Sequence, residues 1–145
     1  MNCKVLVVDD EADMLELLDT NFRAQGYEVR TAATGIQALN EARAFLPDLI
    51  VLDLLLGELD GLAVCEILRA QPSTSDIPVI VITAMGGMIP QFHALDSGAS
   101  DFLTKPFSPR DLLQRAEKII AARIASLIAT LEDEAAEDSG LINRF

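Results

Sequence analysis

Residues 5–11 read VLVVDDE, and residues 49–53 read LIVLD. Each stretch is a continuous apolar run that ends in carboxylates. A short apolar run of this kind is typical of a strand buried on both faces of a parallel sheet. Comparable or weaker runs occur three more times along the chain. The predicted strands are Cys3–Val8, Tyr27–Thr31, Leu49–Leu52, Val79–Ile82 and Asp101–Leu103.

Apolar residues at helical spacing separate these strands. The pattern predicts helices around Met14–Phe22, Ile36–Ala42 and Leu62–Leu68, while Gly98 is expected to end a fourth helix and Ser108-Pro109 to begin a fifth. Alternating strands and helices with right-handed crossovers predict an α/β fold. We expect a doubly wound five-stranded parallel sheet in the flavodoxin-like order 2-1-3-4-5, with helices on both faces. The active crevice of such a sheet lies beyond the carboxyl ends of its strands.

The composition limits the class of protein. The chain has 145 residues, of which 50% are apolar, and a formal net charge of -12, which fits one domain with its own core. Its apolar runs are far shorter than the roughly 20 residues that span a bilayer, so we expect no membrane segment and a cytoplasmic location. The acidic excess argues against direct nucleic-acid binding. Cys3 and Cys65 are isolated and are expected to be free thiols.

Carboxylates gather at the predicted strand ends. Asp9, Asp10 and Glu11 follow the first strand and Asp53 follows the third. Any one of them alone is most simply a helix cap or a solvated loop residue. Around one crevice they would repel each other unless a cation intervened. Hard oxygen ligands without histidine or cysteine favour Mg²⁺ over zinc.

Five motifs occur in order at these strand ends: VLVVDDE (5–11), LIVLD (49–53), DG (60–61), ITA (82–84) and GASDFLTKPF (98–107). Together they resemble the receiver domain of two-component response regulators, chemotaxis regulators included. The resemblance covers residues 1–122, where we expect one receiver domain. A helical extension and an acidic tail are expected over residues 123–145.

The resemblance implies a role for each residue of the cluster. Asp53 would accept the phosphoryl group and, with Asp10 and the backbone carbonyl of Leu55, bind Mg²⁺ directly. Asp9 would lie in the outer shell of the metal. Lys105 would pair with a phosphoryl oxygen. Phosphoryl transfer asks for little more than such a positioned nucleophile and nearby positive charge.

The resemblance also implies a switch and partners. Thr83 would donate its hydroxyl to the phosphoryl group, and Phe102 would move into the space behind it, unless its ring is permanently buried in the core. The fourth helix, fifth strand and fifth helix would then control a downstream protein or effector domain. The phosphoryl donor would be a sensor histidine kinase or a phosphotransfer protein. Such a domain catalyses only its own phosphorylation and slow dephosphorylation.

Three positions near the acceptor bear on its chemistry. Gly57 stands where the family usually has proline, which gives the loop more freedom. Leu55 and Met85 lie two residues after Asp53 and Thr83, where apolar side chains cannot orient an attacking water. We therefore predict a long-lived phosphoryl group. His93, the sole histidine, is expected on the fourth helix away from the strand ends.

Two other classes of protein are open alternatives. A metal-dependent aspartyl-phosphate hydrolase of the haloacid-dehalogenase type would carry an Asp-x-Asp motif after the first strand and a cap domain, and neither is seen. An FMN-binding flavodoxin would need a phosphate-cradling loop rich in glycine or hydroxyls after the first strand, where this chain has three acids.

The apolar pattern of the fifth helix continues beyond the receiver region. Ile120, Ile124, Leu127 and Leu131 are spaced 4, 3 and 4, and a helix from Pro109 to Leu131 would reach roughly 34 Å and overhang the domain. We expect this helix to form a homodimer or to connect to an effector. The alternative is a break near Arg123 with the chain folding back. Residues 132–145 are expected to fray as a solvated acidic tail or to begin a linker.

Overall fold

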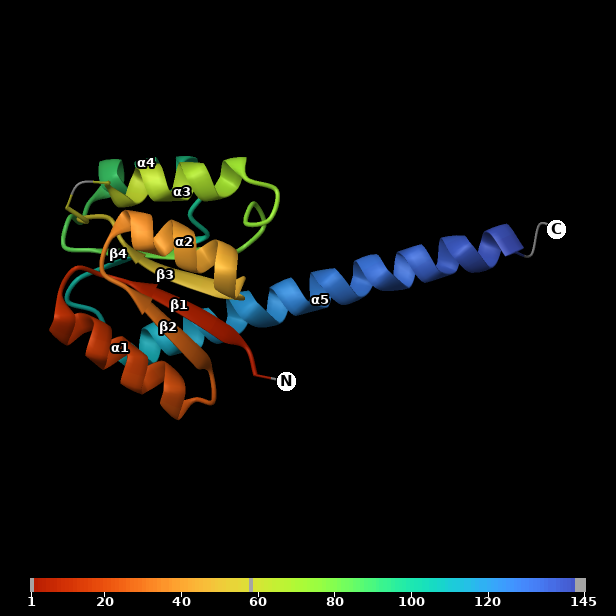
Figure 1. The fold of residues 1–145 in the computed structure, drawn as a ribbon, viewed down its shortest axis with the longest axis horizontal. Coiled ribbons are helices and arrows are strands. Elements are labelled where there is room, and N and C mark those ends of the chain that lie inside the picture. Colours follow the sequence, from red (N-terminus) through yellow and green to blue (C-terminus); the bar gives the residue numbers. More distant parts are fainter. Residues whose placement is uncertain (1, 58, 143–145) are drawn as a thin grey trace.

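The computed structural model describes residues 2–57 and 59–142 and alternates strands with helices throughout (Figure 1). The strands are β1 (Lys4–Val8), β2 (Glu28–Ala32), β3 (Leu49–Asp53), β4 (Val79–Thr83) and β5 (Asp101–Thr104). The helices are α1 (Ala12–Ala24), α2 (Gly35–Phe45), α3 (Gly61–Ala70), α4 (Met88–Asp96) and α5 (Pro109–Ile142). The predicted strands are thus confirmed to within a residue or two at each end.

All strands pair in parallel, and their order in the sheet is β2-β1-β3-β4-β5. This is the predicted flavodoxin-like order. The winding reverses between β1 and β3, so the carboxyl ends of these two neighbouring strands meet at the crevice that the fold provides.

The two faces of the sheet carry separate cores. Val5 and Val7 of β1 pack toward Phe22 of α1 and Leu112 of α5. Alternate residues of the same strand, such as Leu6, pack on the opposite face, which α2, α3 and α4 cover (Figure 1). Strands buried on both sides need apolar residues at nearly every position, and β3 and β4 are buried at all of theirs.

The ends of several helices follow from local sequence. The side chains of Thr34 and Asp60 accept hydrogen bonds from the backbone of α2 and α3 and so cap them. Gly26 lies at φ +93° just after α1, a conformation that favours glycine. Cys3 and Cys65 are free thiols, as expected, and burial raises the pKa of Cys65 to about 11.

Helix α5 departs from two expectations. It runs unbroken from Pro109 to Ile142, so the alternative of a break near Arg123 is wrong. The fraying expected from residue 132 is also wrong as far as Ile142, while residues 143–145 lie outside the described part. At about 1.5 Å per residue, the helix is roughly 51 Å long, and it projects far beyond the sheet (Figure 1).

An ion pair holds α5 where it leaves the domain. Arg123 donates through Nη1 to Oδ1 of Asp48 at 2.9 Å, and the other oxygen of Asp48 accepts the backbone N–H of Lys4 at 2.8 Å. Asp48 immediately precedes β3, so this contact is at the sheet edge opposite the carboxyl ends of the strands. Among the described residues, no helix has the length and apolar character needed to cross a bilayer.

Candidate functional site

Four strands bring polar side chains to one edge of the sheet. Asp9 follows β1, Asp53 ends β3, Thr83 ends β4 and Lys105 follows β5. The first three are among the few buried polar residues, with exposed fractions of 2%, 4% and 0%. Buried carboxylates are costly unless they are paired, so this arrangement needs a compensating cation.

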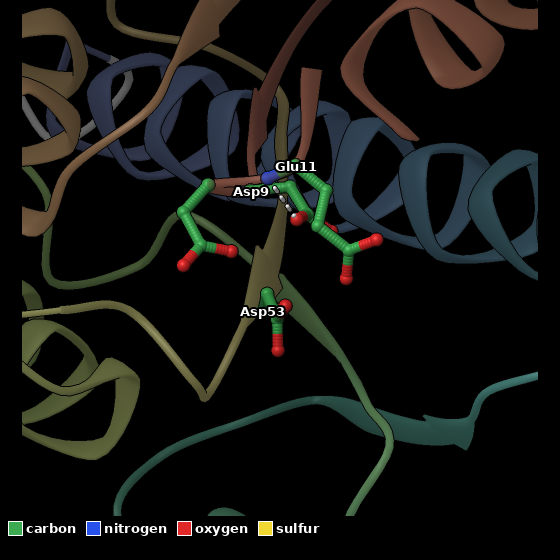
Figure 2. Close-up of side chains that lie close together, drawn as sticks. Asp9, Glu11 and Asp53 are labelled. Carbon is green, nitrogen blue, oxygen red and sulfur yellow. Dashed lines mark hydrogen bonds between the residues drawn. The ribbon is translucent and has the colours of Figure 1, made fainter. Parts of the chain in front are cut away.

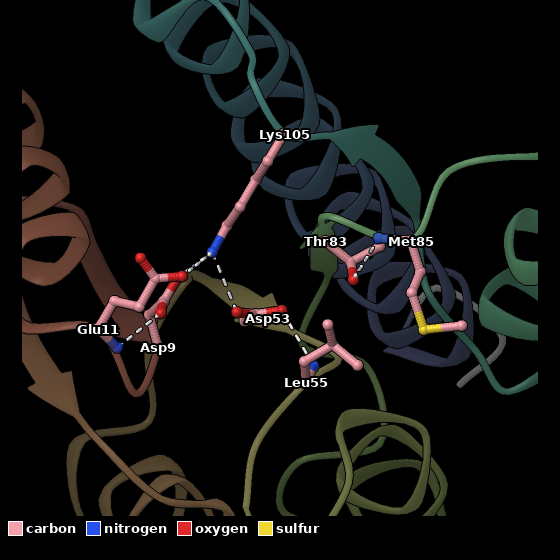
Figure 3. Close-up of polar contacts among 7 residues, drawn as sticks. All are labelled: Asp9, Glu11, Asp53, Leu55, Thr83, Met85 and Lys105. Atoms are coloured by element: carbon pink, nitrogen blue, oxygen red, sulfur yellow. Dashed lines mark hydrogen bonds and ion pairs between the residues drawn. The ribbon is translucent and has the colours of Figure 1, made fainter.

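Lys105 is that cation in the structure (Figure 3). Its Nζ atom lies 2.9 Å from Oδ2 of Asp9, 3.0 Å from Oδ2 of Asp53 and 3.3 Å from Oε1 of Glu11. The peptide bond between Lys105 and Pro106 is cis. One ammonium group therefore contacts three carboxylates that come from two neighbouring strand ends.

Backbone groups hold the remaining oxygens of the two buried carboxylates. Oδ1 of Asp9 accepts the N–H of Glu11 at 2.9 Å, and Oδ1 of Asp53 accepts the N–H of Leu55 at 3.0 Å. Each of these aspartates thus has one oxygen on the backbone and the other on Lys105. Both side chains are fixed in direction.

The charges of the site shift its pKa values. Burial raises the pKa of Asp53 and the Asp9 charge adds to this, although hydrogen bonds from Leu55 and Lys105 act the other way. Burial alone would lower the pKa of Lys105. Its hydrogen bonds to Asp9 and Asp53 and the charges of these carboxylates together raise the pKa by more, so the net pKa lies above the ordinary range. Lys105 is therefore fully protonated near neutral pH.

The acidic side chains are close enough to share one cation. Asp9, Asp10, Glu11 and Asp53 each offer a carboxylate oxygen, and these atoms all lie within 4.8 Å of one another. Figure 2 shows Asp9, Glu11 and Asp53 converging on the same space. A set made only of carboxylate oxygens fits a hard divalent ion such as Mg²⁺. Glu11, to which the sequence assigned no role, joins the site through Lys105.

Thr83 and Phe102 lie beside this cluster. The buried hydroxyl of Thr83 accepts the N–H of Met85 at 3.2 Å (Figure 3). Phe102 is half-buried and packs at the border of the core under α2, α3 and α4. In this structure it is not the fully buried core ring that was the alternative to a mobile switch residue.

A shallow apolar pocket of about 290 Å³ adjoins the site. Its lining includes Leu55 and Met85 from the loops after β3 and β4, and Ile89, Pro90 and His93 from α4. His93 is exposed on α4 and shares this pocket with the loop residues Leu55 and Met85. Leu55 and Met85 are both about half exposed.

The fold and the site define a class of protein: a flavodoxin-like α/β domain with an acidic cluster and one lysine at the switch point of its sheet. The family model of the response regulator receiver domain matches residues 5–117, and the chain belongs to this family. Members of the family are signalling domains, not enzymes in the usual sense. The resemblance seen in the sequence motifs is confirmed.

Two curated relatives give the context. The alkaline phosphatase synthesis transcriptional regulatory protein PhoP of Bacillus subtilis is 44% identical over 120 residues, which cover 83% of this chain and 49% of PhoP. The DNA-binding dual master transcriptional regulator RpaA of Synechocystis is 39% identical over 117 residues, covering 81% of this chain and 48% of RpaA. The chain spans about half the length of these relatives. One name describes a transcriptional regulatory protein and the other a DNA-binding transcriptional regulator. These names count against the expectation that nucleic acid is not a direct partner.

Solved structures agree with the fold. The receiver domain of Francisella response regulator 1452 has a TM-score of 0.79 at 34% identity, with 84% of this chain and 99% of that chain covered. The chemotaxis response regulator CheY4 of Vibrio cholerae has a TM-score of 0.78 at 28% identity, with 82% and 99% covered.

Proposed function

We propose that this receiver domain accepts a phosphoryl group on Asp53 and changes its surface in response. The observation that supports this most directly is the buried Asp53 carboxylate, with Oδ2 on Lys105 and Oδ1 on the backbone of Leu55. A fixed carboxylate beside a protonated lysine suits nucleophilic attack on phosphorus with charge compensation on the phosphoryl oxygens.

The transfer step balances as follows. An oxygen of Asp53 forms a bond to phosphorus while the bond between phosphorus and the donor's imidazole nitrogen breaks. The imidazole leaves and takes up a proton, and Asp53 becomes an acyl phosphate. Lys105 pairs with one phosphoryl oxygen, and the hydroxyl of Thr83 donates to another.

Asp10, Asp53 and the backbone carbonyl of Leu55 would hold Mg²⁺, with Asp9 in its outer shell. The bound ion supplies positive charge that offsets the carboxylates and the incoming phosphoryl oxygens. The fit rests on the carboxylate oxygens that converge within 4.8 Å. Lys105 neutralises part of the same cluster and would pair with a phosphoryl oxygen.

Readout would pass through Thr83. Its hydroxyl, which accepts the N–H of Met85 in this structure, would turn to donate to a phosphoryl oxygen. Phe102 would then move into the space behind it. The surface formed by α4, β5 and α5 then changes its affinity for a downstream protein or effector domain. Met88, Ile89 and Phe92 of α4 are all strongly exposed, so apolar anchors are present on this surface.

The partners follow from this chemistry. A sensor histidine kinase or a phosphotransfer protein would donate the phosphoryl group in the cytoplasm, where this chain is expected. Its relatives' names make a DNA-binding effector the natural output of a longer protein of this kind. DNA contact would then come from the effector, since the net charge of this chain is -12.

Mass spectrometry tests the proposal. Incubation with acetyl phosphate and Mg²⁺ is expected to add one phosphoryl group per chain, carried by the peptide that contains Asp53, and EDTA should suppress the gain. The competing hydrolase would instead turn over many phosphate esters continuously. Steady turnover without a phosphorylated chain would contradict the receiver function.

The phosphoryl group is expected to be long-lived. Leu55 and Met85 flank the site and neither can orient a water for in-line attack. The double variant Leu55→Asn, Met85→Glu supplies groups that can, and should shorten the half-life of the acyl phosphate several-fold. Release of inorganic phosphate from the phosphorylated chain measures this rate.

A matched variant separates water placement from a looser pocket. Ile89→Asn introduces the same amide into the same pocket, but from α4. Its half-life should equal that of the parent. The idea fails if the double variant decays no faster than the parent, or if Ile89→Asn accelerates decay as much.

A further inference from the structure

The outer part of α5 is a helix without support from its own domain. We call residues 124–142 the extension. Ile124, Leu127, Ile128 and Leu131 form an apolar stripe along it, exposed by 41 to 64%. Their spacing of 3, 1 and 3 puts them on one face of the helix. Most helical stability in proteins comes from packing such a face, and here the face is open.

Charge gives the extension no compensating support. Residues 124–143 contain no lysine or arginine, so the extension cannot form stabilising acid–base pairs one turn apart. Its acidic residues lie toward the carboxyl end, where negative charge opposes the helix dipole. Gly140 adds a further cost inside a helix. A continuous helix to Ile142 therefore calls for a partner along the stripe.

The charge distribution points to a second copy of this chain as the partner. A net charge of -12 repels another copy over most of the surface. Residues 121–131 are the exception, because the only charge among them is Arg123, which pairs with Asp48 of its own domain. Alanine, serine and threonine flank the stripe and allow close approach. Two copies can therefore meet here without bringing like charges face to face.

The position of the stripe leaves room for that copy. At roughly 100° per residue, its centre is about 70° around the helix from Leu112, Ala116 and Ile120, which pack on the sheet. The partner helix would therefore run beside the domain rather than through it. Ile124, Leu127 and Leu131 give steps of three and four, the spacing of a two-stranded seam.

Orientation follows from what lies beyond the stripe. In an antiparallel pair centred on residues 124–131, the acidic residues 132–138 of each helix would run along the partner's domain, which is itself negatively charged. In a parallel pair these residues project away from both domains. We propose that two copies of this chain pair in parallel through the stripe of Ile124, Leu127, Ile128 and Leu131.

The parallel pair has one built-in weakness. Glu134 continues the spacing of the seam, and five of the seven residues 132–138 are acidic. Like charges would meet their own copies just past Leu131, so the dimer is expected to be weak, with dissociation in the micromolar range. Added salt, which screens such repulsion, should tighten it several-fold, and Glu134→Gln should do the same.

Sedimentation analysis of the whole chain tests the pairing from low to high micromolar concentration. The parent should shift from monomer to dimer, and its helical circular dichroism per residue should rise along with the shift. Leu127→Gln with Leu131→Gln should weaken association at least tenfold. Ala122→Gln with Ala129→Gln, which puts the same side chains on the opposite face, should leave it unchanged. All four positions are exposed, so the domain itself is not disturbed.

A crosslink tests the direction of the pair. Leu131→Cys in a Cys3→Ser background should form an interchain disulfide under mild oxidation only if the helices are parallel, because antiparallel copies of residue 131 lie far apart along the axis. A monomer at every concentration, or equal weakening by both glutamine pairs, overturns the proposal. A dimer without this crosslink overturns its parallel form. Asp53→Asn, which cannot be phosphorylated under the proposed function, should dimerise like the parent. The test of pairing is therefore separate from the test of phosphorylation.

Discussion

Asp53→Asn is expected to abolish phosphorylation of this chain by acetyl phosphate. The amide keeps the shape of the carboxylate but is a far poorer nucleophile, and loss of the attacking group costs on the order of a thousandfold or more in rate. Intact mass spectrometry under conditions that phosphorylate the parent fully should show no added phosphoryl group. The amide oxygen can still accept a hydrogen bond from Lys105, so the fold should persist.

Asp96→Asn provides the matched control. Asp96 is exposed at the end of α4, and the same change of one carboxylate to an amide there should leave the rate unaltered. Thermal unfolding of both variants checks that each is folded. Phosphorylation of Asp53→Asn at the parental rate would move the acceptor to another residue and sink the proposed role.

The sheet was predictable because the local sequence pattern identifies each strand. Runs such as Val5–Val8 and Val79–Ile82 are apolar at every position, which only a strand covered on both faces requires. The convergence of Asp9 and Asp53 was predictable for a related reason, since the carboxyl ends of parallel strands share one edge. The identity of the oxygens that meet Lys105 depends on side-chain geometry, and no sequence pattern carries it.

Other features could not be predicted from the sequence because they depend on long-range or competing effects. The acidic composition after Leu131 predicted fraying, whereas α5 continues to Ile142. Good helix formers such as Ala135 and Ala136 favour the helix but do not replace the packing that it lacks. The pocket that His93 shares with Leu55 and Met85 depends on the helical phase of the short α4, which the sequence does not resolve. The demand for glycine at position 61 arises only where α3 meets the end of β3.

Gly61→Ala is expected to destabilise the domain by about 1–3 kcal/mol. A Cβ atom on Gly61 would stand 2.6 Å from both the carbonyl oxygen of Asp53 and the Cα atom of Leu54. Both are backbone atoms, which cannot rotate away as a side chain would. The N–H of Gly61 also donates to the carbonyl of Leu54 at 3.0 Å, so α3 cannot retreat without losing that bond. Urea unfolding followed by circular dichroism measures the loss.

Gly57→Ala, in the loop that leads to α3, is the control. A Cβ atom there would meet nothing within 4 Å, so the midpoint of urea unfolding should stay where it is or rise slightly as the unfolded chain loses freedom. The clash at Gly61 presses on the backbone of Asp53 itself, so this variant should also take up phosphate more slowly while Gly57→Ala does not. Equal stability of the two variants would mean that β3 and α3 separate freely, and Asp53 would then lack the rigid backbone that holds its carboxylate against Lys105.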